Sequence, residues 1–405
     1  MTTTVLVIFL IVYLGMLLGR LPRLQLDRTG VALLGAIALL TTGAIGFEEA
    51  NAAVDKTTLA LLFGLMVVSA QLRLGGFYAR VTEWLATLRV GPSVLLAILI
   101  FTIGALSAVF SNDIVCLAVT PVLIDACRRR NLDPVPFLLG LAAAANVGSA
   151  ATLIGNPQNM LIGQTLGLSF AAYLVDAVPP VLFGLLATWG VIAFQHRSRW
   201  TLNATNDPAP EDLQPFDRWQ TTKGIGVALF LLVAFLFTSW PREIVALTGA
   251  GLLLMSRRLH SRSMLGLVDW QLLILFIGLF VVNHALEAAG FVANAVSALE
   301  TRGIHPDQPG WLFVLTLLLS NTVSNVPAVM LLLPVAHHPQ AGPLLGLVST
   351  LAGNFLIVGS IANIIVVDMA SQKGIAIDWR RHARTGIPVT LVTLALAAVF
   401  LWMRG

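Results

Sequence analysis

Two short polar clusters, each built on a Ser-Asn pair, interrupt long apolar runs of this sequence. They lie in VFSNDIVCLAVTP (residues 109–121) and TVSNVPAVMLLLP (residues 322–334), and in both a proline follows the serine by ten residues. The polar members are Ser111, Asn112 and Asp113 in the first cluster, and Asn321, Thr322, Ser324 and Asn325 in the second. Polar groups at membrane depth must be enclosed by protein or line a water-filled cavity. We therefore expect both clusters to face one polar site that binds a small solute.

Two further polar interruptions, NVGSAATLIGNPQN (residues 146–159) and NFLIVGSIAN (residues 354–363), divide long apolar spans that follow these clusters. The candidate solute-binding residues are Asn146, Gly155, Asn156 and Asn159 in the first, and Gly359, Ser360 and Asn363 in the second. Glycine and proline break a helix, and a broken helix offers N–H groups to anions and polar solutes and carbonyls to cations. The alternative is that these asparagines and serines only hold helices together.

Asp113 is the one carboxylate in the two Ser-Asn clusters, and it is the candidate proton-coupling residue. A carboxylate at membrane depth is costly and is usually functional. The alternative is a structural carboxylate held by an arginine or by backbone amides. The two cysteines, Cys116 and Cys127, are too few for a thiolate cage, so we expect packed thiols, no metal site and no cofactor.

The composition is that of a protein that crosses a membrane several times. Of the 405 residues, 57% are hydrophobic and 11% are charged, whereas soluble domains carry about 25% charged residues. Several apolar runs reach the roughly 20 residues that cross a bilayer. We therefore expect a multi-pass protein of the plasma membrane, which is the inner membrane in cells that also have an outer one. The net charge of +4 resides in loops, and no nucleic-acid partner is expected.

A series of apolar spans and two apolar hairpins is expected along the chain. The spans are about 3–19, 30–46, 57–72, 135–165, 170–195, 223–240, 243–256, 270–288, 342–369 and 386–403. The hairpins, about 91–127 and 309–336, hold the Ser-Asn pairs at their tips. Each hairpin arm is short for a crossing, so re-entrant hairpins are expected, with pairs of full spans as the alternative.

The distribution of Lys and Arg predicts the orientation of these spans. If the N-terminus lies outside, the residues on the outer side are only Lys56, Arg242, Arg302 and Arg404 of the 24 Lys and Arg residues. Loops rich in Lys and Arg stay in the cytoplasm, so the remaining basic loops are assigned to the cytoplasm. The two hairpins then enter the membrane from opposite faces.

The two halves of the chain are related in sequence. LFGLMVVSAQLRLGGF (residues 62–77) matches FIGLFVVNHALEAAGF (residues 276–291) at an offset of 214, and the two Ser-Asn pairs match at an offset of 213. We predict an all-α polytopic fold of two inverted repeats, 1–195 and 223–405, joined by a cytoplasmic linker at 196–222. Each repeat would hold five transmembrane helices and one re-entrant hairpin, with broken helices at the membrane midplane.

At these motifs the sequence resembles the ion transporter superfamily, which holds the ArsB/NhaD permeases and the divalent-anion/sodium symporters. SND (residues 111–113), followed by an apolar run and TP (residues 120–121), is similar to the ArsB-type arsenite permeases. GSIANIIVVDMASQKGIAIDWRRHARTGIPVTL (residues 359–391) resembles the terminal pattern of those permeases. IGNPQN (residues 154–159) is similar to the IGDPPN of the NhaD-like branch, with Asn156 in place of the acid.

This resemblance implies a secondary transporter, not an enzyme, that exports arsenite or antimonite in exchange for protons by alternating access. Asn112, Asn325 and the helix breaks would bind the solute, while Asp113 exchanges a proton. A cytoplasmic ATPase is implied as a partner in some members, and a homodimer is a further candidate assembly. The alternatives are a sodium-coupled permease for anions such as dicarboxylates or sulfate, a sodium/proton antiporter of the same fold, and an uncoupled channel. The sequence has no His-Glu-x-x-His or Gly-x-Ser-x-Gly motif of an enzyme.

Overall fold

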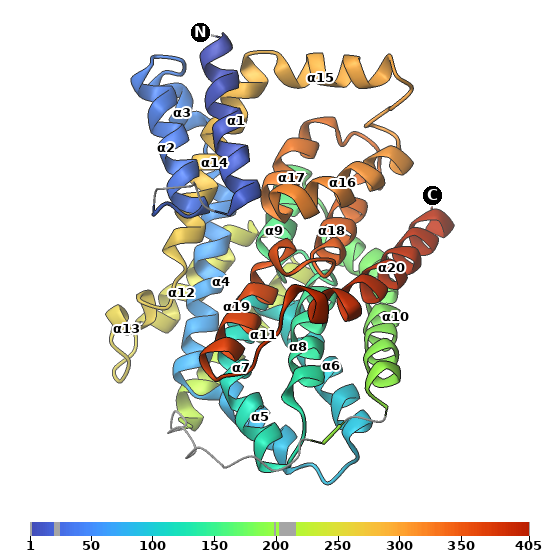
Figure 1. Ribbon diagram of the computed structural model, residues 1–405. Helices are drawn as coiled ribbons and strands as arrows, with labels where there is room; N and C mark the ends of the chain where they lie inside the picture. Colours follow the sequence, from blue (N-terminus) through green and yellow to red (C-terminus); the bar gives the residue numbers. More distant parts are fainter. Residues whose placement is uncertain (1, 20–24, 198–199, 202–215, 405) are drawn as a thin grey trace.

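The computed structural model describes residues 2–19, 25–197, 200–201 and 216–404, and this part of the chain forms one helical bundle (Figure 1). Six of its helices are long and apolar enough to cross a membrane: α4 (Lys56–Leu74), α6 (Pro92–Val109), α10 (Phe170–His196), α11 (Arg218–Phe237), α14 (Trp270–Ala288) and α20 (Trp379–Arg404). The described residues contain no strand beyond one isolated bridge, which confirms the all-α prediction.

The remaining helices are shorter and complete the bundle. They are α1 (Thr2–Leu18), α2 (Arg28–Thr41), α3 (Phe47–Ala53), α5 (Phe77–Thr87), α7 (Asn112–Arg129), α8 (Pro134–Ser149), α9 (Pro157–Thr165), α12 (Arg242–Leu254), α13 (Ser261–Leu265), α15 (Phe291–Glu300), α16 (Pro309–Val323), α17 (Asn325–Leu332), α18 (Ala341–Ala352) and α19 (Ile361–Gln372), with 3₁₀ turns η1 (Leu333–Val335) and η2 (Ile357–Gly359). Helix α10 ends at His196 and α11 begins at Arg218, and the cytoplasmic linker expected at 196–222 stays a prediction, because its residues 198–199 and 202–215 lie outside the described part of the chain.

Both predicted polar interruptions are helix breaks. The first separates α8 from α9, and Asn156 caps α9 by accepting a hydrogen bond from the Asn159 backbone N–H at 2.9 Å. The second separates α18 from α19, with η2 between them. Every residue of α8 and of α18 is buried, so the two helices that lead into the breaks form the centre of the bundle.

The two expected hairpins are present as helix pairs, α6–α7 and α16–α17. Ser111 precedes α7 with a backbone that any residue adopts. Ser324 precedes α17 with φ 78° and ψ 160°, a region in which a residue with a side chain is strained. That each pair re-enters the membrane as a hairpin, rather than crossing it as two full spans, stays a prediction.

Helix boundaries in the two halves follow the offset of 214 that the sequence shows. Asp55 caps α4 by accepting from the Thr57 N–H at 3.0 Å, and Asp269 caps α14 by accepting from the Leu272 N–H at 2.9 Å. Gly76 and Gly290, with φ 75° and 79°, turn the chain into α5 and α15. Glycine is favoured in this left-handed region because it has no Cβ.

Helices α5 and α15 lie at opposite ends of the bundle (Figure 1). This placement is the one that inverted halves would give, and the repeat organisation itself stays a prediction. The two helices differ in packing, since α5 buries Tyr78, Thr82 and Leu85 whereas α15 buries no residue. The apolar-span analysis did not anticipate either helix, because both are too short to cross a membrane.

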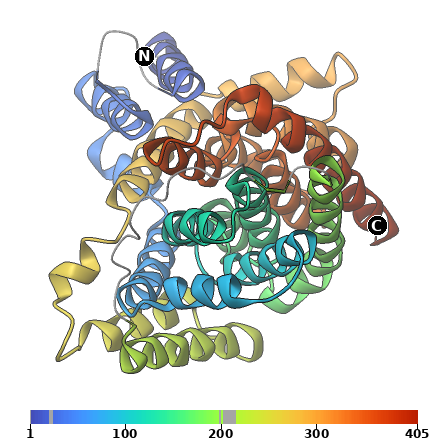
Figure 2. The same cartoon turned by 60° about the horizontal axis from the view of Figure 1, so that its bottom comes forward.

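The helices pack in two groups that mix the two predicted halves. In the first group, α2 packs on α14 and α4 on α11 and α12; in the second, α6 packs on α8, α10 on α20, α16 on α18 and α7 on α19. Helices α1, α2 and α14 lie to one side of the bundle, away from the C-terminal end of α20 (Figures 1 and 2). With α9 and α17, which pack on α18, the second group contains both helix breaks and both helix pairs, and therefore the candidate site.

Candidate solute-binding site

Five buried polar side chains meet where the two helix breaks face each other, and we call them the asparagine cluster. Its members are Asn112, Asn146, Asn354, Ser360 and Asn363. The Asn146 amide nitrogen donates to Oδ1 of Asn354 at 2.8 Å and to Oδ1 of Asn363 at 3.2 Å. Its own Oδ1 accepts from Asn112 Nδ2 at 3.2 Å and from Ser360 Oγ at 2.8 Å. Asn146 thus joins the tip of the α6–α7 pair to the second helix break.

The asparagine cluster also satisfies backbone groups that the second break leaves free. Asn363 Nδ2 donates to the carbonyl oxygens of Gly353 at 2.8 Å and Leu356 at 3.2 Å. The last carbonyls of a helix lack hydrogen-bond partners within that helix. Inside a membrane, no water is present to take the place of those partners. The amide of Asn363 therefore stabilises the break at the same time as it contacts Asn146.

A second group of polar side chains holds the first break, and we call it the first-break cluster: Ser149, Asn156, Gln158, Asn159, Tyr173 and Thr350. Asn156 Nδ2 donates to Ser149 Oγ and to Thr350 Oγ1, both at 3.1 Å. Gln158 Nε2 donates to the same Thr350 hydroxyl at 3.2 Å. Because Thr350 belongs to α18, this cluster again connects the two breaks.

The tip of the α16–α17 pair lies against the second break. Asn325 is 9% exposed, and its Nδ2 lies 3.2 Å from the position that a Cβ on Gly353 would occupy. Asn321 Oδ1 lies 3.4 Å from the equivalent position on Gly359. The α6–α7 tip approaches the first break, since the Asn112 backbone N–H donates to the Gly155 carbonyl at 3.4 Å. Both tips and both breaks therefore adjoin one polar region, although no hydrogen bond joins Asn112 to Asn325 in the described residues.

Several buried polar atoms of this region have no hydrogen-bond partner in the described part of the chain. They are Oγ of Ser107, Ser320 and Ser349, and Oδ1 of Asn112, Asn159, Asn321 and Asn325. Buried polar groups are almost always paired with protein or water. These atoms are all amide oxygens or hydroxyls, so a ligand or water that donates hydrogen bonds would satisfy them.

Two of the predicted residues make no side-chain hydrogen bond to the site within the part of the chain that the structure describes. Thr322 is exposed, and its hydroxyl donates to the carbonyl of Leu318 at 3.1 Å, a bond within its own helix. Ser111 is half-buried and makes no side-chain cap on α7. The aqueous cavity expected between the clusters stays a prediction.

Asp113 stands in the first turn of α7, next to Asn112 of the asparagine cluster. It is half-buried, and no hydrogen bond or ion pair reaches its carboxylate within the described ranges. The alternative that an arginine or backbone amides hold this carboxylate in place therefore finds no support here. Its role in proton coupling stays a prediction.

The sequence interpretation omitted Asn354, although it begins one of the segments singled out, and it omitted Thr350 and Tyr173. Asn354 completes the asparagine cluster and Thr350 joins the breaks. The available signal was the amide at the first position of NFLIVGSIAN. Thr350 and Tyr173 carry no comparable signal, because a single hydroxyl in an apolar helix is common.

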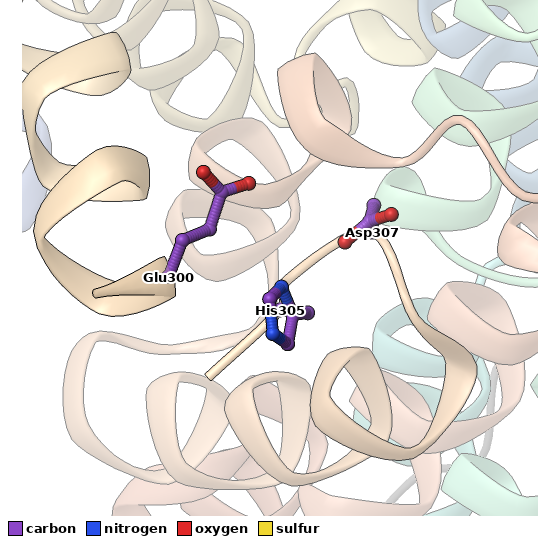
Figure 3. Close-up of side chains that lie close together, drawn as sticks. All are labelled: Glu300, His305 and Asp307. Carbon is purple, nitrogen blue, oxygen red and sulfur yellow. The ribbon is translucent and has the colours of Figure 1, made fainter. Parts of the chain in front are cut away.

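Two other sets of side chains are of types that could bind metals. Cys116 and Cys127 are free and buried, as expected for packed thiols. Glu300, His305 and Asp307 have ligand atoms within 4.8 Å of one another at the end of α15, and both carboxylates are exposed (Figure 3). Exposed acidic groups of this kind are common, and nothing else in the described residues points to a metal at this place.

Broken helices that meet inside an apolar bundle and offer amide and hydroxyl groups are characteristic of secondary membrane transporters. The comparison with protein families agrees. The family described as "Citrate transporter" (CitMHS) matches residues 4–352, and the chain belongs to this family.

Relatives and solved structures are transporters as well. An uncharacterised transporter of Mycobacterium tuberculosis is 30% identical over 409 residues, covering 94% of each chain. A silicon efflux transporter of Oryza sativa subsp. japonica is 29% identical over 451 residues, covering 93% of this chain and 92% of its own. The YdaH transporter of Alcanivorax borkumensis, whose topology is described as unusual, shares the fold with a TM-score of 0.58 at 14% identity, covering 100% and 98% of the chains. The protein is therefore a multi-pass membrane transporter and not an enzyme.

Proposed function

We propose that this transporter exports arsenite and antimonite, as uncharged hydroxides, in exchange for protons. The observation that carries the proposal is the asparagine cluster, which presents only amide and hydroxyl groups and no Lys or Arg. Trivalent arsenic is largely the neutral hydroxide at neutral pH, and its O–H groups are hydrogen-bond donors. The unpaired Oδ1 atoms of Asn112 and Asn325 are acceptors that such donors would satisfy.

A silicon efflux transporter among the relatives supports this class of solute. Dissolved silicon at neutral pH is also an uncharged hydroxide, and the same amide and hydroxyl groups would suit it. A solute without charge avoids the desolvation penalty that an ion meets in a low-dielectric site. We therefore expect selection for small neutral polyhydroxyl solutes rather than for charge.

Coupling to protons is assigned to Asp113 in this proposal. Its carboxylate has no partner in the described residues and follows Asn112, so a change in its protonation alters the charge beside the solute. Alternating access between the inverted halves, 1–195 and 223–405, would move the site from one side to the other. A cytoplasmic ATPase and a second copy in a homodimer are candidate partners, to be tested by co-purification.

A sodium-coupled anion permease is the second candidate, because the family is described as a citrate transporter. A multiply charged anion would need positive charge from bound sodium ions, since the asparagine cluster supplies none. Sodium dependence therefore separates the two candidates. A sodium/proton antiporter of the same fold would show sodium flux without the other solute.

The test is uptake into everted membrane vesicles energised with a proton gradient. Arsenite is compared with phosphate, sulfate, citrate and sodium, and sodium is then replaced by choline. We expect arsenite uptake that depends on the pH gradient and is unchanged in choline. Uptake of citrate or sulfate that disappears in choline would establish the sodium-coupled permease instead, and uptake without dependence on the gradient would indicate a channel.

A further inference from the structure

His382 is a buried imidazole that the proposed mechanism does not use. It stands in the first turn of α20 and is 5% exposed. Its ring has no hydrogen bond or ion pair in the described part of the chain, and only its backbone N–H is bonded, to the Asp378 carbonyl at 3.0 Å. A buried titratable ring without a partner requires a physical explanation.

The ring lies beside the second helix break. Gly386 follows His382 by one helical turn, and a Cβ built there would lie 3.0 Å from the ring carbon Cε1 and 3.2 Å from Nδ1. The same Cβ would collide with the backbone oxygen of Asn354, a member of the asparagine cluster. Because Gly386 has no side chain, the His382 ring and the Asn354 backbone can both lie close to this position of α20.

The corresponding position in the first half has a comparable role. Tyr173 is the fourth residue of α10, as His382 is the fourth residue of α20. The Tyr173 hydroxyl donates to the Ala150 carbonyl at 3.0 Å and accepts from Asn159 Nδ2 at 3.1 Å, so it is bonded to the first break. A phenol stays neutral at physiological pH, whereas an imidazole can gain and lose a proton there. The two halves therefore place a fixed group at one break and a titratable group at the other.

The carboxylates near α20 already have partners. The elements that pack against α20 are α8, α10, α18 and η2, and neither α18 nor η2 contains a titratable residue. The groups on α8, α10 and α20 and at their ends are Asp133, Tyr173, Asp176, His196, Asp378, Arg380, Arg381, Arg384 and Arg404. Arg381 holds Asp133 at 3.4 Å, Arg404 holds Asp176 at 2.7 Å, and Asp378 accepts from the Arg381 N–H at 2.7 Å. No carboxylate is left to fix the charge of the His382 ring.

We propose that His382 is a second proton-carrying residue of the transport cycle, placed between the asparagine cluster and the cytoplasm. This inference rests on the proposed proton-coupled export. The ring accepts the proton that leaves Asp113 after the inward step and becomes an imidazolium. It then releases the same proton to cytoplasmic water and returns to the neutral ring. The predicted cytoplasmic side fits this direction, because the first turns of α20 carry Arg380, Arg381 and Arg384.

The test uses the full-length protein in proteoliposomes and compares wild type with His382→Gln, His382→Tyr and the control His196→Gln. Arsenite counterflow at equal pH measures solute movement without net proton transfer. Arsenite flux driven by a pH gradient, with the pH on the cytoplasmic side varied between about 5 and 8, measures proton transfer. His196 lies in the last turn of α10, away from the asparagine cluster, and serves as a histidine on the same side.

We expect His382→Gln to keep counterflow within about twofold while pH-driven flux falls by at least roughly tenfold and loses its pH dependence. His382→Tyr copies the residue of the first half, so restored pH-driven flux in this variant would show a structural role and overturn the inference. A wild-type pH profile in His382→Gln would overturn it too.

If both His382 variants fail to fold, the wild-type protein alone decides the inference. A wild-type pH-driven flux that does not vary between about pH 5 and 8 contradicts a carrier histidine, and a variation centred in that range that His196→Gln leaves unchanged supports it. Failure of the proposed function has a different signature, because a wild type without arsenite counterflow refutes arsenite export before any variant is compared.

Discussion

Replacing Asn146 by alanine tests the central residue of the asparagine cluster. The substitution removes four hydrogen bonds, at 2.8, 2.8, 3.2 and 3.2 Å, that join α8 to α7 and to the second break. Such bonds contribute about 0.6 kcal/mol each between membrane helices and about 1 kcal/mol each in soluble proteins, so four give about 2 to 4 kcal/mol. We therefore expect Asn146→Ala to lower the free energy of unfolding by about 2 to 4 kcal/mol.

In the same variant, we expect a larger effect on arsenite transport than on the free energy of unfolding. A tenfold change in solute affinity corresponds to about 1.4 kcal/mol. Asn146 holds the solute-binding residues Asn112 and Asn363 in position. Without it, we expect the half-saturating arsenite concentration to rise at least roughly tenfold. The assays are SDS titration in mixed micelles for stability and vesicle uptake for transport. The control is Thr316→Val, which removes a buried hydroxyl whose bond, to the Leu312 carbonyl at 2.6 Å, stays within α16.

The control should change unfolding by less than about 1 kcal/mol and leave the half-saturating concentration unaltered. Asn146→Ala with wild-type stability would mean that the cluster bonds contribute nothing to the fold. Asn146→Ala with reduced stability and wild-type arsenite affinity would show that the asparagines only hold helices together, which is the alternative reading of the sequence.

Three further variants probe separate parts of the proposal. Asp113→Asn should abolish pH-driven arsenite flux while counterflow and folding persist, and normal pH-driven flux would remove this residue from the mechanism. The double variant Cys116→Ala with Cys127→Ala should still confer arsenite resistance on a sensitive host, whereas a host that becomes sensitive would indicate thiol ligands. Gly148→Val should lower the free energy of unfolding by about 1 to 3 kcal/mol, because a Cβ at this position collides with the backbone of Gly104. An unchanged thermal midpoint of the valine variant would contradict this close helix contact.

Helix positions could be predicted closely where apolar length and a capping residue agree. The span expected at 270–288 is α14, and Asp269 caps it. The helix breaks could also be located, because Gly155 and Pro157 cannot continue a regular helix. The short helices α5 and α15 could not be found by apolar length, since they are too short to span a bilayer.

The partners within the site could be predicted only in part. Asn112, Asn146 and Asn363 were singled out from their polar surroundings, and they meet in the structure. The sequence could not predict which amides form hydrogen bonds with each other, because this depends on how α8 crosses the second break. The repeat did not identify Asn354 either. The offset between the two halves changes after the hairpins, so the position in the second half that corresponds to Asn146 cannot be found by adding a constant number.

The hydrogen bonds of Asn146 have a consequence for how the chain is made. Its partners in the second break lie 208 to 217 residues later in the sequence. While the ribosome is still synthesising those residues, the newly inserted α8 carries into the membrane an amide nitrogen that lacks both of its acceptors. Early helices must therefore wait, shielded by the insertion machinery or by one another, until α18 and α19 arrive. A chain interrupted before residue 363 would keep an unsatisfied polar centre and should be degraded rather than accumulate.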